Sequence, residues 1–70
     1  MDRELVDSTL IKSIGYDATR SELEVELRSG LVYRYAGVPE FLYRGLTLAG
    51  SKGAFFNSRI RDRYPFVLVE

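Results

Sequence analysis

Four polar side chains near the C-terminus could do chemistry together, and that chemistry is phosphate binding. Arg59, Arg61 and Arg63 stand at alternate positions, and a guanidinium binds phosphate through two parallel hydrogen bonds and stacks on bases. On a helix, Asn57 shares a face with Arg61, as Arg59 does with Arg63. The candidate nucleic-acid-binding residues are Lys52, Asn57, Arg59, Arg61, Arg63 and Tyr64, the last placed to stack on a base. The alternative is a solvated helix face on which Arg61 pairs with a carboxylate such as Asp17 or with a helix C-terminus.

A second candidate is the short stretch Gly50-Ser51-Lys52-Gly53, which is expected to join the end of one helix to the start of the next. The free N–H groups and the positive end of the helix dipole would favour an anion there, and Lys52 adds a charge. The length and the final Lys-Ser/Thr of a P-loop are absent. The alternative is a plain corner between helices, capped by Ser51.

The residues needed for catalysis are largely missing. The chain has no His and no Cys, which excludes a thiol nucleophile, an imidazole base, a disulfide and the usual zinc sites. Glu22, Glu24 and Glu26 alternate along one segment, about 6.5–7 Å apart on one strand face. No other group completes a site with them, so they are expected to form the solvent face of a half-buried sheet. The sequence therefore predicts no enzyme, no cofactor and no metal.

The formal net charge of zero hides an uneven distribution. Residues 1–27 carry three basic and seven acidic side chains, whereas residues 28–70 carry seven basic and three acidic ones. Neutrality argues against a tight, non-specific nucleic-acid clamp but permits a small local phosphate site. We expect the acidic sheet face and the basic second helix to lie on opposite sides of the molecule.

Three strands are expected before the helices. Residues 10–16 form the first, with Leu10, Ile14 and Tyr16 on one face, and residues 22–28 alternate strictly between acidic and apolar side chains. A three-residue loop ending at Gly30 leads to the third strand, residues 31–35. That register puts six apolar residues on one face: Leu23, Val25, Leu27, Leu31, Tyr33 and Tyr35. It also places Glu24 opposite Arg34 and makes the tyrosines core residues.

Two helices are expected to follow. Pro39 suits a first helical turn, after which Leu42, Leu46 and Ala49 form an apolar stripe that Phe41 and Leu48 widen. A left-handed Gly50 is expected to end the first helix, and Ser51 to cap the second. The second helix is expected over residues 52–62, with Phe56 and Ile60 toward the core. Residues 66–69 then form a short fourth strand or an ordered tail.

Two blocks of this sequence closely resemble the KTSC domain, a small bacterial domain named after its occurrence at the C-terminus of some lysyl-tRNA synthetases. The first is the central Tyr33-Arg34-Tyr35. The second consists of Ser51, Gly53, Phe55, Phe56, Asn57, Ile60, Arg61 and Tyr64. Phe55 departs from the commoner Tyr and lacks its hydroxyl. The resemblance implies a domain of unknown function that is a candidate for RNA binding, and a free-standing copy of this size could not aminoacylate tRNA.

Together these observations predict a single α+β domain over residues 1–70, with a core of about 8–65: a three-stranded antiparallel meander followed by two short helices on one face. The longest apolar run, residues 66–69, is far too short to cross a membrane. The N-terminus lacks the features of a secretory signal, so we expect a cytoplasmic protein. We also expect a monomer. RNA, either tRNA or single-stranded, is the expected partner. A protein partner bound through segregated charges or an exposed edge strand is the alternative.

Overall fold

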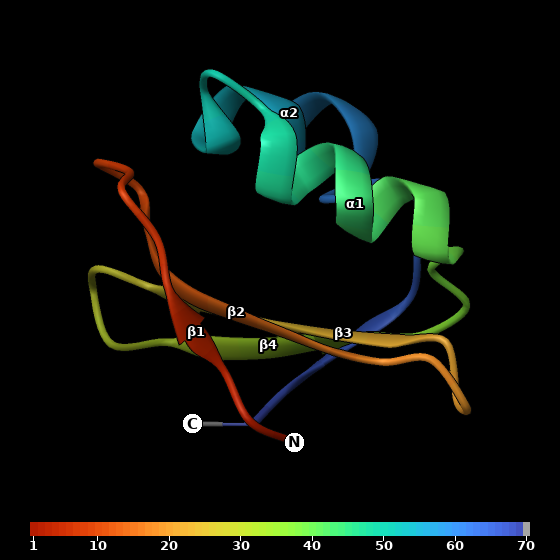
Figure 1. Ribbon diagram of the computed structural model, residues 1–70. Coiled ribbons are helices and arrows are strands. Elements are labelled where there is room, and N and C mark those ends of the chain that lie inside the picture. Colours follow the sequence, from red (N-terminus) through yellow and green to blue (C-terminus); the bar gives the residue numbers. More distant parts are fainter. Residues whose placement is uncertain (70) are drawn as a thin grey trace.

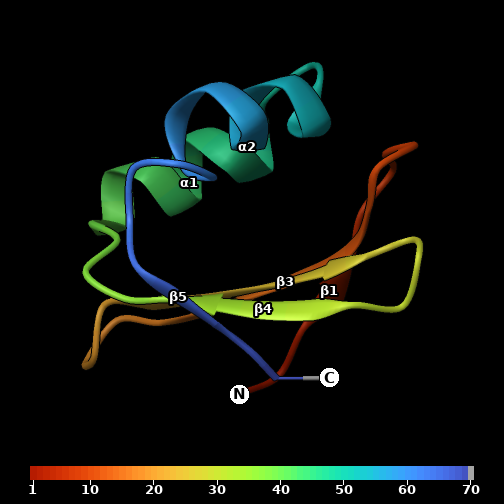
Figure 2. The same cartoon turned by 180° about the vertical axis from the view of Figure 1, so that it is seen from behind.

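A computed structural model describes residues 1–69 and shows one antiparallel sheet with both helices on the same face (Figures 1 and 2). The elements in chain order are β1 (Glu4–Leu5), β2 (Ile11–Asp17), β3 (Glu22–Leu27), β4 (Val32–Tyr35), α1 (Glu40–Leu48), α2 (Lys52–Arg59) and β5 (Phe66–Leu68). The sheet order β1-β2-β3-β4-β5 is a simple meander, interrupted between β4 and β5 by the helices. The α+β class and the antiparallel sheet are confirmed. The count of three strands is wrong, because the described chain has five.

The predicted register of the β3–β4 hairpin is confirmed. Leu23 lies opposite Tyr35 and Val25 opposite Tyr33, and the N–H of Leu27 donates to the carbonyl of Leu31 at 2.9 Å. Gly30 ends the three-residue loop with a φ of 100°, a conformation that costs a glycine little. The apolar pattern therefore decides the register, because a slip by one residue would turn Leu23 and Val25 toward the other face.

The first predicted strand contains an irregularity that the alternation did not reveal. Ile11 lies opposite Leu27 while Ser13 lies opposite Glu26, so Lys12 is an extra residue in β2. Such a bulge changes which side chains face inward. As a result Ile11 is fully buried, whereas Leu10, predicted to share the inner face, is half-buried.

Both sheet edges lie outside the predicted meander. β1 pairs with β2 through Glu4 opposite Ile14, and nothing in its two exposed residues predicted a strand. β5 pairs with β4, with Phe66 opposite Tyr35 and Leu68 opposite Tyr33, so the C-terminal segment is a strand and not a tail.

The helices follow the predicted order but differ at their ends. Ser51 caps α2 by accepting a hydrogen bond from Ala54 N–H at 3.3 Å, as expected. The predicted left-handed cap at Gly50 is wrong, because α1 ends in an extended Ala49 with φ −65° and ψ 139°. Within residues 1–69, neither helix is both long and apolar enough to cross a membrane.

The predicted apolar stripe of α1 is narrower than expected. Leu42 and Leu46 are buried, but Phe41 is 71% exposed and Leu48 is 84% exposed. The distinction follows from helix geometry, because positions 42 and 46 are one turn apart on the face toward the sheet whereas 41 and 48 lie on the opposite side.

The core lies between the helices and the inner face of the sheet. Its fully buried side chains include Ile11, Ile14, Leu23, Val25, Leu46, Phe56 and Ile60. The tyrosines belong to this layer, as predicted. Tyr35 is 2% exposed, and Tyr16 stacks on Tyr43 at 4.8 Å between ring centroids while its hydroxyl donates to the Val38 carbonyl at 2.6 Å.

We expect Gly15→Ala to detach the N-terminal segment and to lower the free energy of unfolding by about 1–2 kcal/mol. A Cβ at position 15 would lie 2.5 Å from the carbonyl oxygen of Asp2, so the backbone must move. Urea unfolding and amide hydrogen exchange of residues 3–6 would measure both effects. Gly50→Ala is the matched control, since nothing lies within 4 Å of its Cβ. Equal stability of the two variants would contradict this packing.

Candidate nucleic-acid interface

Three arginines gather where α2 ends. The helix stops at Arg59, earlier than the predicted Asp62, and Ile60 leaves helical geometry at φ −123° and ψ −49°. The N–H groups of Ile60 and Arg61 both donate to the carbonyl of Phe56, at 3.0 and 2.9 Å, and the second of these bonds ends the helix in a wider turn. Because Ile60 is fully buried, it anchors this turn while the side chains on either side of it face solvent.

Local contacts hold each of these arginines in place. Arg61 Nη1 donates to Asn57 Oδ1 at 3.2 Å, and Arg63 Nε donates to the Ser58 carbonyl at 3.1 Å. The Arg59 guanidinium lies 5.6 Å from the centroid of the Phe55 ring, within the range of a cation–π contact. We call Arg59, Arg61 and Arg63 the arginine cluster.

The alternative pairing of Arg61 with Asp17 is not found. Asp17 instead accepts hydrogen bonds from the Thr19 hydroxyl at 2.6 Å and the Thr19 N–H at 3.0 Å. The hydrogen bond from the Thr19 side chain is the main cause that lowers the pKa of Asp17.

The arginine cluster has no carboxylate partner among residues 1–69. The salt bridges in this part of the chain are Arg3–Glu24 at 2.6 Å, Arg34–Glu24 at 2.9 Å and Arg44–Glu40 at 2.9 Å. Arg61 and Arg63 each use one nitrogen in the contacts above, so most of their donors remain free. A phosphate could therefore bind there without displacing an ion pair.

Two predicted site residues lie apart from the cluster. Lys52 is at the opposite end of α2, roughly 10 Å away along the axis, and its Nζ donates to the Ala49 carbonyl at 3.1 Å. Tyr64 is half-buried and packs against the core, so it does not stand free to stack on a base. Asn57 does join the cluster, through Arg61.

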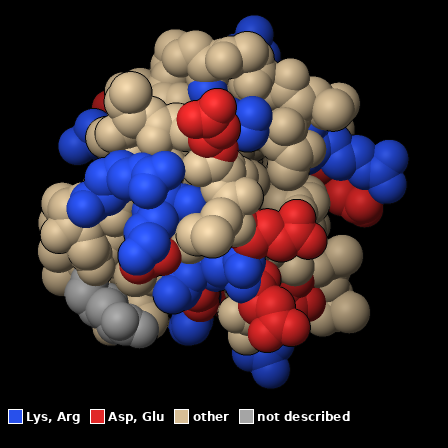
Figure 3. Space-filling view, turned by 60° about the vertical axis from the view of Figure 1, so that its left-hand side comes forward, with Lys and Arg blue, Asp and Glu red and all other residues tan. Residues whose placement is uncertain are grey.

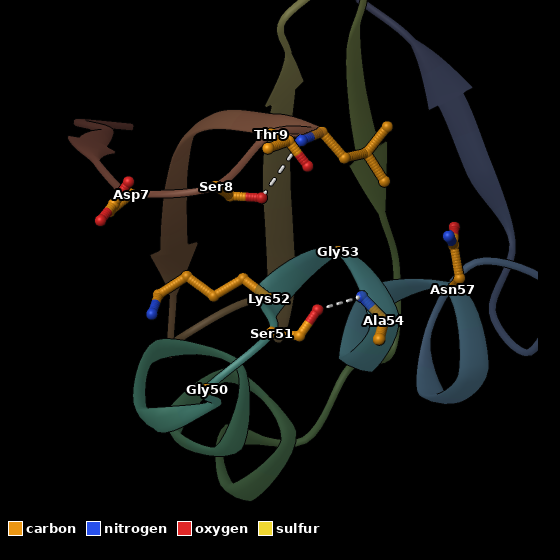
Figure 4. Close-up of a pocket in the computed structure, with 10 residues that line it drawn as sticks. Asp7, Ser8, Thr9, Gly50, Ser51, Lys52, Gly53, Ala54 and Asn57 are labelled. Atoms are coloured by element: carbon orange, nitrogen blue, oxygen red, sulfur yellow. Dashed lines mark hydrogen bonds between the residues drawn. The ribbon is translucent and has the colours of Figure 1, made fainter.

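Lys52 instead borders a groove of about 610 Å³ beside the start of α2. Figure 4 shows Asp7, Ser8 and Thr9 on one wall and Ser51 and Lys52 on the other. Ser51 already satisfies one N–H of the helix start. The stretch Gly50-Ser51-Lys52-Gly53 thus has the contacts of a plain corner between two helices, capped by Ser51, which was the alternative to an anion site.

The acidic segment is not the open solvent face that its alternation predicted. Glu24 is 4% exposed; Arg3 Nη1 donates to its Oε1 at 2.6 Å, and Arg34 Nε and Nη2 donate to its Oε2 at 3.1 and 2.9 Å. Burial alone would raise the pKa of Glu24, but the hydrogen bonds from Arg34 and Arg3 outweigh it and hold the pKa below 4.5.

Because Leu23 and Val25 face the helices, Glu24 between them lies on the sheet face away from α2, as expected, but that face is not purely acidic. The strand hairpin brings Arg34 from the basic half of the chain onto Glu24 in the acidic half. Figure 3 likewise shows basic and acidic side chains next to one another. In the part of the chain that the structure describes, the acidic side chains form no cluster that could hold a metal ion.

Sequence reasoning missed a hollow of about 220 Å³ next to the cluster. Arg61 and Asp62 lie on one side of it, and Tyr33, Tyr35 and Phe66 on the other. The alternation of Tyr33 and Tyr35 indicated their common face. The position of Phe66 depended on the pairing of β5, which the sequence left open.

The comparisons with known proteins agree on one family. The family model described as KTSC domain matches residues 7–64. A protein of Stutzerimonas stutzeri (strain A1501) is 38% identical over 64 residues, which are 91% of this chain and 90% of that protein. A lysine–tRNA ligase of Nostoc punctiforme is 35% identical over 60 residues, which are 86% of this chain and 11% of the ligase. The crystal structure of a KTSC domain protein from Yersinia pestis has a TM-score of 0.96 at 36% identity, covering 99% of this chain and 97% of the other. This chain therefore belongs to the KTSC domain family.

Proposed function

We propose that this chain is a non-catalytic, monomeric module of the cytoplasm that binds RNA through the arginine cluster. The observation that carries the proposal is the set of three exposed arginines within five positions, none of them paired with a carboxylate of residues 1–69. Guanidinium groups suit the bidentate recognition of phosphate. A relative of this domain within a lysine–tRNA ligase, a protein that acts on tRNA, supports RNA as the polyanion.

In this proposal the residues have different tasks. Arg59, Arg61 and Arg63 contact successive backbone phosphates, and Asn57 positions Arg61 through its hydrogen bond. Lys52 and Tyr64 contribute little, because Lys52 lies at the other end of α2 and Tyr64 packs against the core. Zero net charge predicts modest affinity, and the phosphate contacts make that affinity fall as salt rises.

We expect the double variant Arg59→Ala/Arg63→Ala to bind a short single-stranded RNA and unacylated tRNA about tenfold more weakly at low salt. The dependence of log Kd on log salt should become shallower by about 0.7 for each lost contact. Fluorescence anisotropy over a salt series measures both quantities.

The matched control is Lys12→Ala/Arg20→Ala, which removes the same charge from two exposed positions outside the cluster, one in β2 and one in the turn that follows it. It should bind nearly as tightly as the unmodified chain. Equal losses in the two double variants would show that only net charge matters, and would contradict a local site.

A second candidate function is protein binding at the β5 edge. Phe66, Val67 and Leu68 are each more than half exposed on the last strand of the sheet, and such an edge can accept an extended peptide as a further strand. We expect Leu68→Lys to abolish capture of a partner that persists after nuclease treatment, with Leu48→Lys on the exposed face of α1 as the control. Capture that is insensitive to Leu68→Lys would contradict this function.

A further inference from the structure

The hollow beside the arginine cluster has the lining of a site for a flat ring. It lies between the helix-facing side of β4 and β5 and the turn that follows α2. Figure 2 shows the segment after α2 descending from the helix layer to β5. At about 220 Å³ it is smaller than the 300–1,000 Å³ typical of drug-sized ligands, so it suits one small planar group.

Aromatic rings form the wall on the sheet side. The rings of Tyr33 and Phe66 meet edge to face at 5.3 Å, and those of Tyr35 and Phe66 lie 5.5 Å apart. The sheet register builds this wall, because Phe66 in β5 is opposite Tyr35 in β4. Phe66 is 53% exposed and Tyr33 is half-buried, so both rings offer surface to a ligand.

The hydroxyl of Tyr35 is the polar group of this hollow that has no partner within the described chain. Tyr35 is only 2% exposed, and no hydrogen bond to a group of residues 1–69 contributes to the state of its hydroxyl. No side-chain oxygen in this part of the chain is both sealed from solvent and unpaired, so the Tyr35 hydroxyl keeps contact with solvent. Tyr35 lines the hollow, where a ligand with a polar edge could take the place of that solvent.

This hydroxyl remains a donor at neutral pH. Burial raises the pKa of Tyr35 above 10.0, although the nearby Arg61 partly opposes the shift. A neutral phenol can both donate and accept a hydrogen bond, which matches the mixed donors and acceptors along the edge of a nucleobase.

Charged groups of both signs lie at the other side of the hollow. Asp62 can accept hydrogen bonds from a ring amino group, and Arg61 belongs both to this lining and to the arginine cluster. A group held in the hollow would thus be next to the proposed phosphate contacts.

From the hollow, its aromatic wall and the unpartnered Tyr35 hydroxyl, we propose that it binds one unpaired nucleobase of the RNA; this inference rests on the proposed function. Phe66 and Tyr33 contact the ring, and the Tyr35 hydroxyl hydrogen-bonds to its edge. Arg61 contacts the adjoining phosphate. The bound RNA is single-stranded at this point, because only an unstacked base can enter such a hollow.

The test compares two probes of equal length and charge, a single-stranded RNA oligonucleotide and an abasic ribose-phosphate oligomer. Tyr35→Phe removes only a hydroxyl from a buried ring, so we expect the fold to persist. We expect it to weaken oligonucleotide binding about five- to tenfold and to leave abasic binding unchanged. Phe66→Ala should weaken oligonucleotide binding at least as much. Tyr43→Phe is the control, because Tyr43 stacks on Tyr16 away from the hollow.

The outcomes separate this inference from the function on which it rests. Unchanged oligonucleotide binding by Tyr35→Phe and Phe66→Ala would overturn the base site, while the arginine cluster could still bind phosphate. Equal weakening of both probes by Tyr35→Phe would also overturn it, since the abasic oligomer has nothing to place in the hollow. If neither probe bound the unmodified chain at low salt, the proposed function itself would fail.

Discussion

Replacing Phe56 by alanine is expected to lower the free energy of unfolding by about 3–5 kcal/mol. Phe56 is 1% exposed and its ring meets that of Tyr35 edge to face at 5.6 Å, so it joins α2 to the sheet. A chain of this length has a total stability of roughly 4–10 kcal/mol. The loss is therefore a large part of the stability, and urea unfolding followed by circular dichroism would measure it.

Two further variants keep this prediction testable if Phe56→Ala does not fold. Phe56→Leu retains most of the apolar volume and should cost less than the alanine variant. Phe41→Ala is the matched control, because Phe41 is 71% exposed and its loss should change stability by no more than about 0.5 kcal/mol. Similar losses for Phe41→Ala and Phe56→Ala would contradict the assignment of the core.

The second large effect is expected at Glu24. Glu24→Gln should lower the free energy of unfolding by about 2–3 kcal/mol, because it removes the charge that holds Arg3 and Arg34. This loss of stability is smaller than the loss expected for a fully buried ion pair, because the side chains of Arg3 and Arg34 are 25% and 40% exposed and regain water. Glu26→Gln is the control; Glu26 accepts a hydrogen bond from the Ser13 hydroxyl at 2.7 Å and has no cationic partner among residues 1–69.

The same carboxylate predicts a dependence on acid. The folded pKa of Glu24 lies below its ordinary value of 4.5. The ion pairs of Glu24 therefore stabilise the fold fully above the unfolded pKa, and this stabilisation is lost as pH falls through the folded pKa. The unmodified chain should therefore lose stability relative to Glu24→Gln as pH decreases below about 4.5. If the difference in free energy of unfolding between the unmodified chain and Glu24→Gln stayed constant from neutral pH into this acidic range, that result would contradict the ion pairs.

Residue patterns along the sequence predicted those parts of the fold that depend on many side chains at once. Six apolar residues that must share one face determine the β3–β4 register, so it could be predicted without knowing any individual tertiary contact. β1 was missed because two exposed residues carry no pattern and the segment is held by long-range contacts: Arg3 with Glu24, and the close approach of Asp2 to Gly15. The bulge at Lys12 was missed because it appears only when β2 is aligned with β3.

The candidate site was predictable to a similar extent. Helical spacing indicated that Asn57 and Arg61 would meet, and they do. The early end of α2 moved Arg63 onto the Ser58 carbonyl, and the packing of Tyr64 against the core was not visible in the spacing. The hollow requires Phe66 opposite Tyr35, a contact between β4 and β5, which both helices separate in the sequence.

A titration of the ¹⁵N-labelled chain with a short single-stranded RNA, followed by amide chemical shifts, tests the central claim most directly. We predict salt-sensitive shifts at residues 57–63 and at Tyr35 and Phe66, with Glu4 and Leu5 of β1, at the opposite edge of the sheet from β5, unchanged. A titration that left residues 57–63 unmoved at low salt, or moved β1 as strongly, would contradict RNA binding at the arginine cluster.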